Sequence, residues 1–173
     1  MKRDKRVDFK EAIKDIKDGA SILIGGWGPI RKPMSLIRTI AQSSLRDLTI
    51  LSLAGMDLDL LIGAGKVKTA IFGFVSFEGA PGGPGNFKRA RQEGTVDMKE
   101  LSEYMFIAQL KAAAERLPFY PTRSGLGTDI LSVNREIKTI EDPYSGQTLV
   151  ALPAFTPDYC IIHVNEADQL GNG

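Results

Sequence analysis

The chain has 173 residues, which is long enough to bury a hydrophobic core within one domain. Its formal net charge of +1 mixes both signs, so nothing indicates a nucleic-acid or membrane partner. No apolar run approaches the ~18 residues of a transmembrane helix, and the charged N-terminus is unlike a signal peptide. The single cysteine, Cys160, excludes an internal disulfide and favours a cytoplasmic location; we expect it to be buried and unreactive.

A helix, a strand and a glycine-rich loop open the chain. Residues 7–18 carry apolar side chains at helical spacing, and Gly19 ends this helix. Residues 21–24 form a short apolar run typical of a strand, and three glycines follow it within four positions. A second helix is predicted from about Pro33, a residue suited to a first helical turn, to about Ser43.

The junction of this strand, loop and helix predicts an anion-binding site. Free backbone N–H groups and the positive end of the helix dipole would point at a ligand there. A dinucleotide fingerprint is disfavoured because its third glycine would fall on Arg31, and no phosphate-binding P-loop sequence follows any glycine run. The alternative is that the glycines serve only a tight turn. The candidate substrate-binding residues are Gly25, Gly26, Trp27, Gly28 and the cations Arg31 and Lys32.

Strands and helices alternate along the rest of the chain. Further strands are predicted at 47–54, 69–77, 94–101 and 159–164, and further helices at 57–62, 87–92 and 103–117. An almost unbroken apolar run such as 47–54 is typical of a strand covered on both faces. We therefore predict an α/β fold with a largely parallel sheet and helices on both faces.

Three stretches are less regular. Residues 79–86 contain four glycines and two prolines, which predicts a loop that either covers a site or simply connects two elements. Residues 118–126 should form an extended passage after the helix that Pro118 stops. Residues 142–146 predict a turn between two short apolar segments at 137–140 and 148–152.

Carboxylates are the main candidates for acid–base chemistry. His163, the only histidine, has no Gly-x-Ser-x-Gly partner motif, and one His with one Cys leaves no zinc site of the usual spacing. We expect it to be a structural polar residue at the end of the last strand. Glu103 directly follows the helix-capping residue Ser102, where the helix dipole stabilises an anion and suits a base or nucleophile. A purely stabilising acid in a first helical turn is the alternative.

Arg123 is the second catalytic candidate. It lies in the extended passage, and Gly125 and Gly127 allow close backbone approach there. A guanidinium at this place can hold a carboxylate or enolate oxygen through two parallel hydrogen bonds. The alternative is an ordinary surface arginine.

Residues 18–34 read DGASILIGGWGPIRKPM: an acidic residue, Gly, two spacers, three apolar residues, then Gly-Gly-aromatic. This pattern resembles the signature of family I CoA-transferase alpha subunits. Trp27 replaces the usual Phe and Arg31 replaces a Gly, and both departures are similar to one branch, the alpha subunits of steroid-ring-opening CoA hydrolases of cholesterol catabolism. The further matches to that branch are Lys32-Pro33-Met34, Gly65-Lys66-Val67-Lys68, Gly73-Phe74-Val75-Ser76, Arg116-Leu117-Pro118-Phe119 and Arg123-x-Gly125-Leu126-Gly127.

The resemblance implies a single CoA-transferase-like domain over residues 1–173, without the family's C-terminal strands. It implies an alpha subunit that shares its site with a beta subunit in a heterodimer or an α2β2 heterotetramer. Coenzyme A enters as part of the substrate, with no separate cofactor and no metal. The resemblance also aligns Glu103 with the catalytic glutamate of the branch, and it implies hydrolytic carbon–carbon ring opening of a steroid-derived cyclic acyl-CoA.

Two other functions stay open at this point. A general CoA-transferase alpha subunit would move coenzyme A between short-chain or dicarboxylic acids. A non-catalytic ligand sensor of related fold should carry a helix-turn-helix and a basic face, and neither is visible in the sequence.

Overall fold

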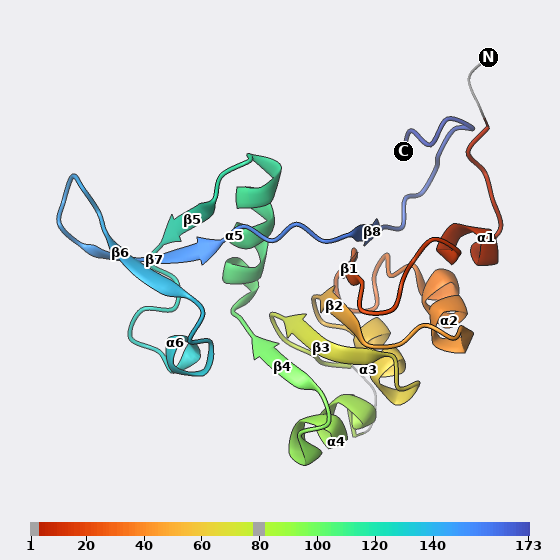
Figure 1. Cartoon of the computed structure of the whole chain (residues 1–173), viewed down its shortest axis with the longest axis horizontal. Coiled ribbons are helices and arrows are strands. Elements are labelled where there is room, and N and C mark those ends of the chain that lie inside the picture. The colour runs from red at the N-terminus through yellow and green to blue at the C-terminus, as the bar shows by residue number, and fades with distance from the viewer. Residues whose placement is uncertain (1–3, 78–81) are drawn as a thin grey trace.

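Two sheets organise the computed structural model, which describes residues 4–77 and 82–173 (Figure 1). The larger sheet has the order β4-β3-β2-β1-β8, and every neighbouring pair in it is parallel. Its strands are β1 (Ser21–Ile24), β2 (Leu48–Ser52), β3 (Val67–Phe72), β4 (Asp97–Glu100) and β8 (Tyr159–Ile161). The smaller sheet is antiparallel, in the order β5-β7-β6, and consists of β5 (Phe119–Thr122), β6 (Lys138–Glu141) and β7 (Thr148–Pro153).

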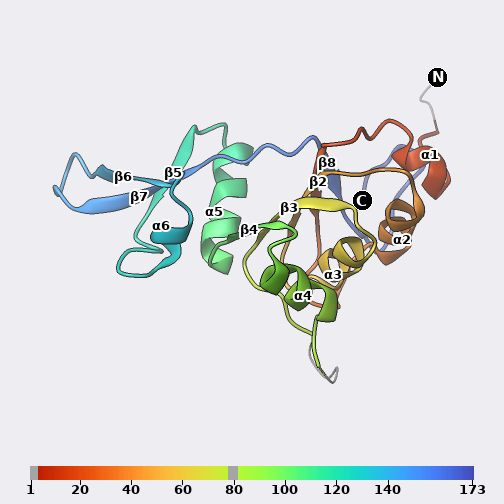
Figure 2. The same ribbon diagram turned by 60° about the horizontal axis from the view of Figure 1, so that its bottom comes forward.

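Helices cover both faces of the parallel sheet, as the sequence predicted. The helices are α1 (Phe9–Ile13), α2 (Met34–Gln42), α3 (Met56–Gly63), α4 (Gly85–Glu93), α5 (Glu103–Ala114) and α6 (Ile130–Val133). The first four pack on one face, where Ile37 of α2 and Leu58 of α3 share a buried cluster with Ile50 of β2 (Figure 2). On the other face, α5 lies between the two sheets, and its Met105 shares a second cluster with Leu51 of β2.

The alternation of side chains along a strand explains why there are two buried clusters, one on each face of the sheet. Ile50 and Leu51 are neighbours in β2, so their side chains point to opposite faces, and both are buried. A strand covered on both faces is what the unbroken apolar run at 47–54 indicated. The predicted strands at 21–24 and 47–54 and the helices after them are therefore confirmed in kind.

The first helix is shorter than predicted. Only Phe9–Ile13 is helical, and of the apolar residues at helical spacing in 7–18 just Ile13 and Ile16 are buried. Val7 is 58% exposed, so the apolar face that would stabilise a longer helix has nothing to pack against. The strand predicted at 69–77 ends earlier, at Phe72 of β3. Phe72 pairs with Glu100, the last residue of β4, and after Glu100 the chain turns into α5, so β3 has no partner strand beyond Phe72 on that side.

The smaller sheet was not predicted as a sheet. The turn at 142–146 is present, with Asp142 accepting hydrogen bonds from Tyr144 N at 3.1 Å and from the Ser145 hydroxyl. It joins β6 and β7 into a hairpin, and the extended passage after Pro118 becomes their partner β5. Val150 and Leu152 of β7 are fully buried, so this sheet closes the second cluster over α5.

The prediction that Cys160 is buried is wrong. Its thiol is free and exposed. The reason is the sheet order: β8 lies at an edge, and its alternate residues Tyr159 and Ile161 take the covered face. Cys160 lies on the opposite face of β8, where its side chain is exposed. That residues 1–173 form one domain without the family's C-terminal strands stays a prediction.

Candidate functional site

The glycine-rich loop forms a tight turn at the carboxyl end of β1. Gly25 N donates to Ile161 O at 2.8 Å, which ties the start of the loop to β8. Trp27 and Ile30 then exchange two backbone hydrogen bonds, of 3.0 and 2.9 Å. Gly26 has φ +91°, and a Cβ there would lie 2.5 Å from Arg31 O, so only glycine fits. The turn requirement proposed as the alternative is thus real at Gly26.

The segments that follow β1, β2 and β3 meet at this edge of the sheet. Because the strands are parallel, their carboxyl ends share one edge, where ligands of open α/β sheets bind. Ala54, after β2, donates its N–H to Phe74 O at 2.9 Å, after β3. The Trp27 ring packs edge-on against Phe74, with centroids 5.8 Å apart. The glycine loop is therefore in direct contact with the segment that follows β3.

The N-terminus of α5 lies against the same segment. A Cβ on Gly73 would lie 3.0 Å from Glu103 Cα, so glycine is required for the backbones to approach this closely. Ser102 caps the helix by accepting a hydrogen bond from Met105 N at 3.2 Å. Glu103, the first residue of α5, is exposed. The backbone of Glu103 therefore lies against Gly73. The residue after Gly73, Phe74, contacts Trp27 of the glycine loop.

The Arg123 segment reaches the same helix end. The hydroxyls of Ser124 and Ser102 are 3.1 Å apart and share a hydrogen bond. Gly125 has φ +95°, and a Cβ on it would lie 3.1 Å from the Met105 sulfur, so this segment passes close over the first turn of α5. Arg123 itself is exposed. Glu103 follows Ser102 in the chain, and Arg123 precedes Ser124. The contact between these two serines therefore brings the backbones that carry Glu103 and Arg123 close together.

Lys32 is placed differently from the expectation that it offers a charge to a ligand. Its side chain is 1% exposed, and its Nζ lies 2.8 Å from Ser52 Oγ and 3.1 and 3.3 Å from the two carboxylate oxygens of Asp57. The ammonium donates hydrogen bonds to Ser52 Oγ and Asp57 Oδ2, and burial of the side chain shields it from a ligand in solution. Asp57 Oδ1 is only a charge contact of the ammonium and has no hydrogen-bond partner among the described residues. Burial lowers the pKa of Lys32, and the Asp57 carboxylate opposes that shift. Arg31, by contrast, is exposed and keeps a positive charge at the loop.

A cavity of about 470 Å³ lies beside the loop but away from the two catalytic candidates. It is lined by Phe9, Lys32–Leu36 and Ile161–Val164, and neither Glu103 nor Arg123 belongs to it. His163 lines this cavity and is exposed, two residues beyond the end of β8. The role expected for His163, a structural polar residue, stays a prediction.

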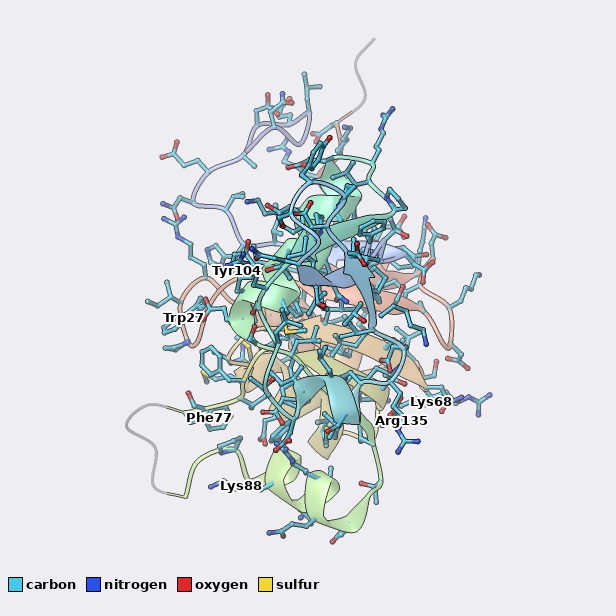
Figure 3. The ribbon with its side chains drawn as sticks, turned by 90° about the vertical axis from the view of Figure 1, so that its left-hand side faces the viewer. Trp27, Lys68, Phe77, Lys88, Tyr104 and Arg135 are labelled. Carbon is cyan, nitrogen blue, oxygen red and sulfur yellow. The ribbon has the colours of Figure 1, made fainter. Side chains whose placement is uncertain are left out.

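Of the aromatic side chains in this region, Trp27 was predicted as part of the site, whereas Tyr104 and Phe77 were not. Figure 3 shows Trp27, Tyr104 and Phe77 on one side of the molecule, with Lys68 and Arg135 on the opposite side. Tyr104 is 51% exposed and Trp27 42% exposed. Gly73 was a usable signal for this region, since glycine is the usual residue where two backbones approach closely. Tyr104 has no such signal, because it occupies an ordinary helix position.

Neither a metal site nor a membrane-spanning helix is found in the part of the chain that the structure describes. Among residues 4–77 and 82–173, no group of His, Cys, Asp and Glu could hold a metal ion. None of the helices described is long and apolar enough to cross a membrane. Residues 79–81 of the predicted loop at 79–86 lie outside the described residues. The rest of it leads into α4, where Asp59 of α3 accepts a hydrogen bond from Phe87 N at 2.8 Å.

The sequence profile of the family described as Coenzyme A transferase matches residues 6–172. The chain belongs to this family. Its sequence is 42% identical to a cholesterol ring-cleaving hydrolase IpdA subunit of Rhodococcus jostii (strain RHA1), over 99% of this chain and 60% of that protein. It is 32% identical to a glutaconate CoA-transferase subunit of Acidaminococcus fermentans, over 96% of this chain and 58% of that protein. The family inferred from residues 18–34 is confirmed.

Solved structures of coenzyme A transferase relatives share the fold. The crystal structure of glutaconate coenzyme A-transferase from Acidaminococcus fermentans superposes with a TM-score of 0.88 at 30% identity, over 95% of this chain and 58% of that one. The decarboxylase AibA/AibB, solved as a cysteine-to-serine variant, gives a TM-score of 0.88 at 29% identity, over 96% of this chain and 64% of that one. The chain spans about 60% of the length of the curated relatives above.

Proposed function

We propose that the chain is part of the alpha subunit of an enzyme that opens a carbon–carbon bond in a cyclic, steroid-derived acyl-CoA by adding water. The observation that carries this proposal is the position of Glu103, at the capped N-terminus of α5 and against the backbone of Gly73. The 42% identical relative, named a cholesterol ring-cleaving hydrolase subunit, supports the choice of substrate.

In the proposed reaction, Glu103 takes a proton from water and the resulting hydroxide attacks a ring ketone. The carbon–carbon bond next to that ketone breaks, and its electron pair moves to the carbon stabilised by the neighbouring carbonyl. That carbon then takes the proton back from Glu103. The products are a new carboxylic acid and a C–H bond, so one water is consumed. The substrate must be a β-diketone or a related ring, since only such a carbanion is stable enough to leave.

Arg123 and the glycine loop have the complementary role. Negative charge develops on the ketone oxygen during hydroxide attack, and fixed donors near it lower the barrier. The Arg123 guanidinium supplies paired donors, and Gly26 and Gly28 let the loop backbone approach without side-chain hindrance. The N–H groups of Gly25 and Trp27 already donate within the protein, to Ile161 O and Ile30 O. The exposed charge of Arg31 suits the phosphates of coenzyme A. Lys32 is left out of ligand binding because its side chain is buried against Ser52 and Asp57.

A partner of the beta type is part of this proposal. The relatives at 42% and 32% identity are both named as subunits. Apolar side chains surround the candidate site: Trp27 and Ile30 on the loop are 42% and 61% exposed, and Tyr104 and Ile107 on α5 are 51% and 40% exposed. Exposed apolar side chains gathered at one place are typical of a protein interface. We propose a heterodimer or an α2β2 heterotetramer in the cytoplasm, with coenzyme A entering as part of the substrate and no separate cofactor.

The second candidate is transfer of coenzyme A between two carboxylic acids. The glutaconate CoA-transferase structure, with its TM-score of 0.88, favours it. In this reaction a second acid accepts coenzyme A and no carbon–carbon bond breaks.

Oxygen-18 water separates the two reactions. The chain is co-expressed with its beta subunit, and the complex receives a cyclic β-diketone acyl-CoA in oxygen-18 water with no acceptor acid. Ring opening predicts a product heavier by one water, with the heavy oxygen in a new carboxylate. An unchanged ring, together with coenzyme A transfer once an acceptor acid is added, would establish the transferase. An unchanged ring with neither reaction would leave the ligand sensor as the better account.

A further inference from the structure

We propose that the buried cluster of Lys32, Ser52 and Asp57 is a positioning device that fixes the glycine loop, residues 25–31, on the sheet. Lys32 acts in this proposal through the backbone of the loop and does not touch a ligand. The consequence for ligand binding rests on the proposed function, whereas the fixing of the loop does not.

The cluster joins three separate elements. Lys32 ends the glycine loop, Ser52 ends β2, and Asp57 lies in the first turn of α3. The Ser52 hydroxyl lies 2.6 Å from Asp57 Oδ2 and 2.8 Å from Lys32 Nζ. The side chains of Lys32 and Asp57 are 1% and 0% exposed. All three polar groups are thus buried and bonded to one another, which defines a single geometry for the end of the loop.

Stability alone is a poor explanation of this cluster. Removing two charges from water costs about as much as their attraction returns, so an apolar replacement of a buried pair is often neutral or stabilising. What an ion pair adds over an apolar contact is direction, because the ammonium must reach particular oxygens. A registering role of this kind is the best-attested use of buried polar groups.

The backbone next to Lys32 needs such a fixing point. Arg31 has φ +55°, a left-handed conformation that is strained for a non-glycine residue. This turn leaves the Arg31 side chain exposed while Lys32 enters the core. The carbonyl of Arg31 in turn lies against Gly26, at the other end of the loop. Anchoring Lys32 therefore fixes Arg31, and Arg31 limits where Gly26 can lie.

Trp27 reports on the loop without any ligand. It is the only tryptophan in the chain, it lies inside the loop, and its ring packs on Phe74. Its fluorescence therefore measures the position of the loop directly, in the full 173-residue chain and in the absence of any partner. A failure of the proposed function leaves this measurement unaffected.

The main variant combines Lys32→Met with Asp57→Asn, which keeps the side-chain sizes and leaves no uncompensated buried charge. We expect a folded protein by circular dichroism in which Trp27 loosens from Phe74. Its acrylamide quenching constant should rise roughly twofold, as an indole now 42% exposed becomes fully exposed, and its emission should move to longer wavelength. Arg91→Met removes an exposed ion pair between Arg91 of α4 and Glu100 of β4; it is the matched control and should leave Trp27 unchanged.

Ser52→Ala is the second, milder variant and decides the matter if the double variant does not fold. It removes the hydroxyl between Lys32 and Asp57 and should move both fluorescence readings in the same direction, by less. A folded double variant, or in its absence a folded Ser52→Ala variant, with the quenching and emission of the original chain would overturn the proposal. The cluster would then serve packing alone.

Discussion

Lys32 and Asp57 are withdrawn from solvent at the carboxyl edge of the parallel sheet, whereas Glu103 at the same edge and Arg123 beside it are exposed. The buried pair is enclosed, and its ammonium donates hydrogen bonds to Ser52 and Asp57 within the core. The backbones of the two exposed residues, Glu103 and Arg123, are held by their sequence neighbours instead, because Ser102 and Ser124 share a hydrogen bond. Both arrangements hold charged residues in place, but by different means.

The difference separates two tasks that a sequence pattern cannot separate. A buried charge that is bonded to neighbouring elements positions the backbone that carries it. An exposed charge on a fixed backbone remains free to meet a substrate. We therefore assign loop geometry to the Lys32 cluster and chemistry to Glu103 and Arg123, and the following variants test that division.

Glu103→Gln should produce the largest change. The amide keeps the shape of the side chain but cannot act as a base, so turnover should fall by ~10²–10⁴ while the unfolding midpoint stays the same. Turnover of the cyclic acyl-CoA by the complex with the beta subunit measures this. Glu115→Gln, an exposed carboxylate at the other end of α5, is the control. Near-normal turnover by Glu103→Gln would show that this acid serves only the helix end.

Lys32→Met alone should destabilise the fold strongly. It leaves the Asp57 carboxylate buried without a counter-charge, which typically costs about 3–5 kcal/mol of unfolding free energy. Urea unfolding measures the loss, and adding Asp57→Asn should restore most of it. Lys99→Met, which breaks the exposed pair with Glu136, should cost no more than about 1 kcal/mol. An equally small loss for Lys32→Met would mean that the pair is open to solvent.

Arg123→Lys should have an intermediate effect on catalysis. A lysine keeps the charge but cannot form two parallel hydrogen bonds, so kcat/KM should fall roughly 10–100-fold. Arg135→Lys, on the side of the molecule opposite Trp27 and Tyr104, is the matched control (Figure 3). Equal kcat/KM for the two variants would remove Arg123 from the mechanism.

Asp158→Asn should have the smallest effect, and it depends on pH. Hydrogen bonds from the Ser21 hydroxyl at 2.6 Å and from Ser21 N at 2.8 Å lower the pKa of Asp158. A lowered pKa means that the anion stabilises the fold above the usual pKa, and that this stabilisation is lost as the pH falls through the folded value. Urea midpoints of the two proteins should therefore differ at about pH 6, and the difference should shrink as the pH falls below the usual pKa of an aspartate. A constant difference would contradict this assignment.

The sequence predicted the elements with strong patterns and missed those that depend on tertiary partners. The apolar run at 47–54 and the glycines after β1 carry their structure locally, so β1, β2 and α2 could be predicted. The antiparallel sheet could not, because residues 128–150 have weak periodicity and β7 gains its burial only by packing over α5. Cys160 was misplaced for a related reason, since no local pattern says that β8 lies at an edge.

The candidate site was predictable only in part. Glu103 follows a recognisable cap, and Gly26 follows a strand, so both positions could be found from residue type and spacing. The burial of Lys32 could not, because its partners Ser52 and Asp57 are 20 and 25 residues away along the chain. Adjacent cations look alike in a sequence, and only the fold separates the buried Lys32 from the exposed Arg31.

The most direct test of the division of tasks is the affinity of the complex for a non-hydrolysable acyl-CoA analogue, measured by calorimetry on two variants. Glu103→Gln should bind within about twofold of the unmodified protein, because its charge acts in the reaction and not in binding. The combined Lys32→Met and Asp57→Asn variant should bind about tenfold more weakly, or ~1.4 kcal/mol, because the loop is no longer held. Weak binding by Glu103→Gln together with normal binding by the combined variant would contradict the account.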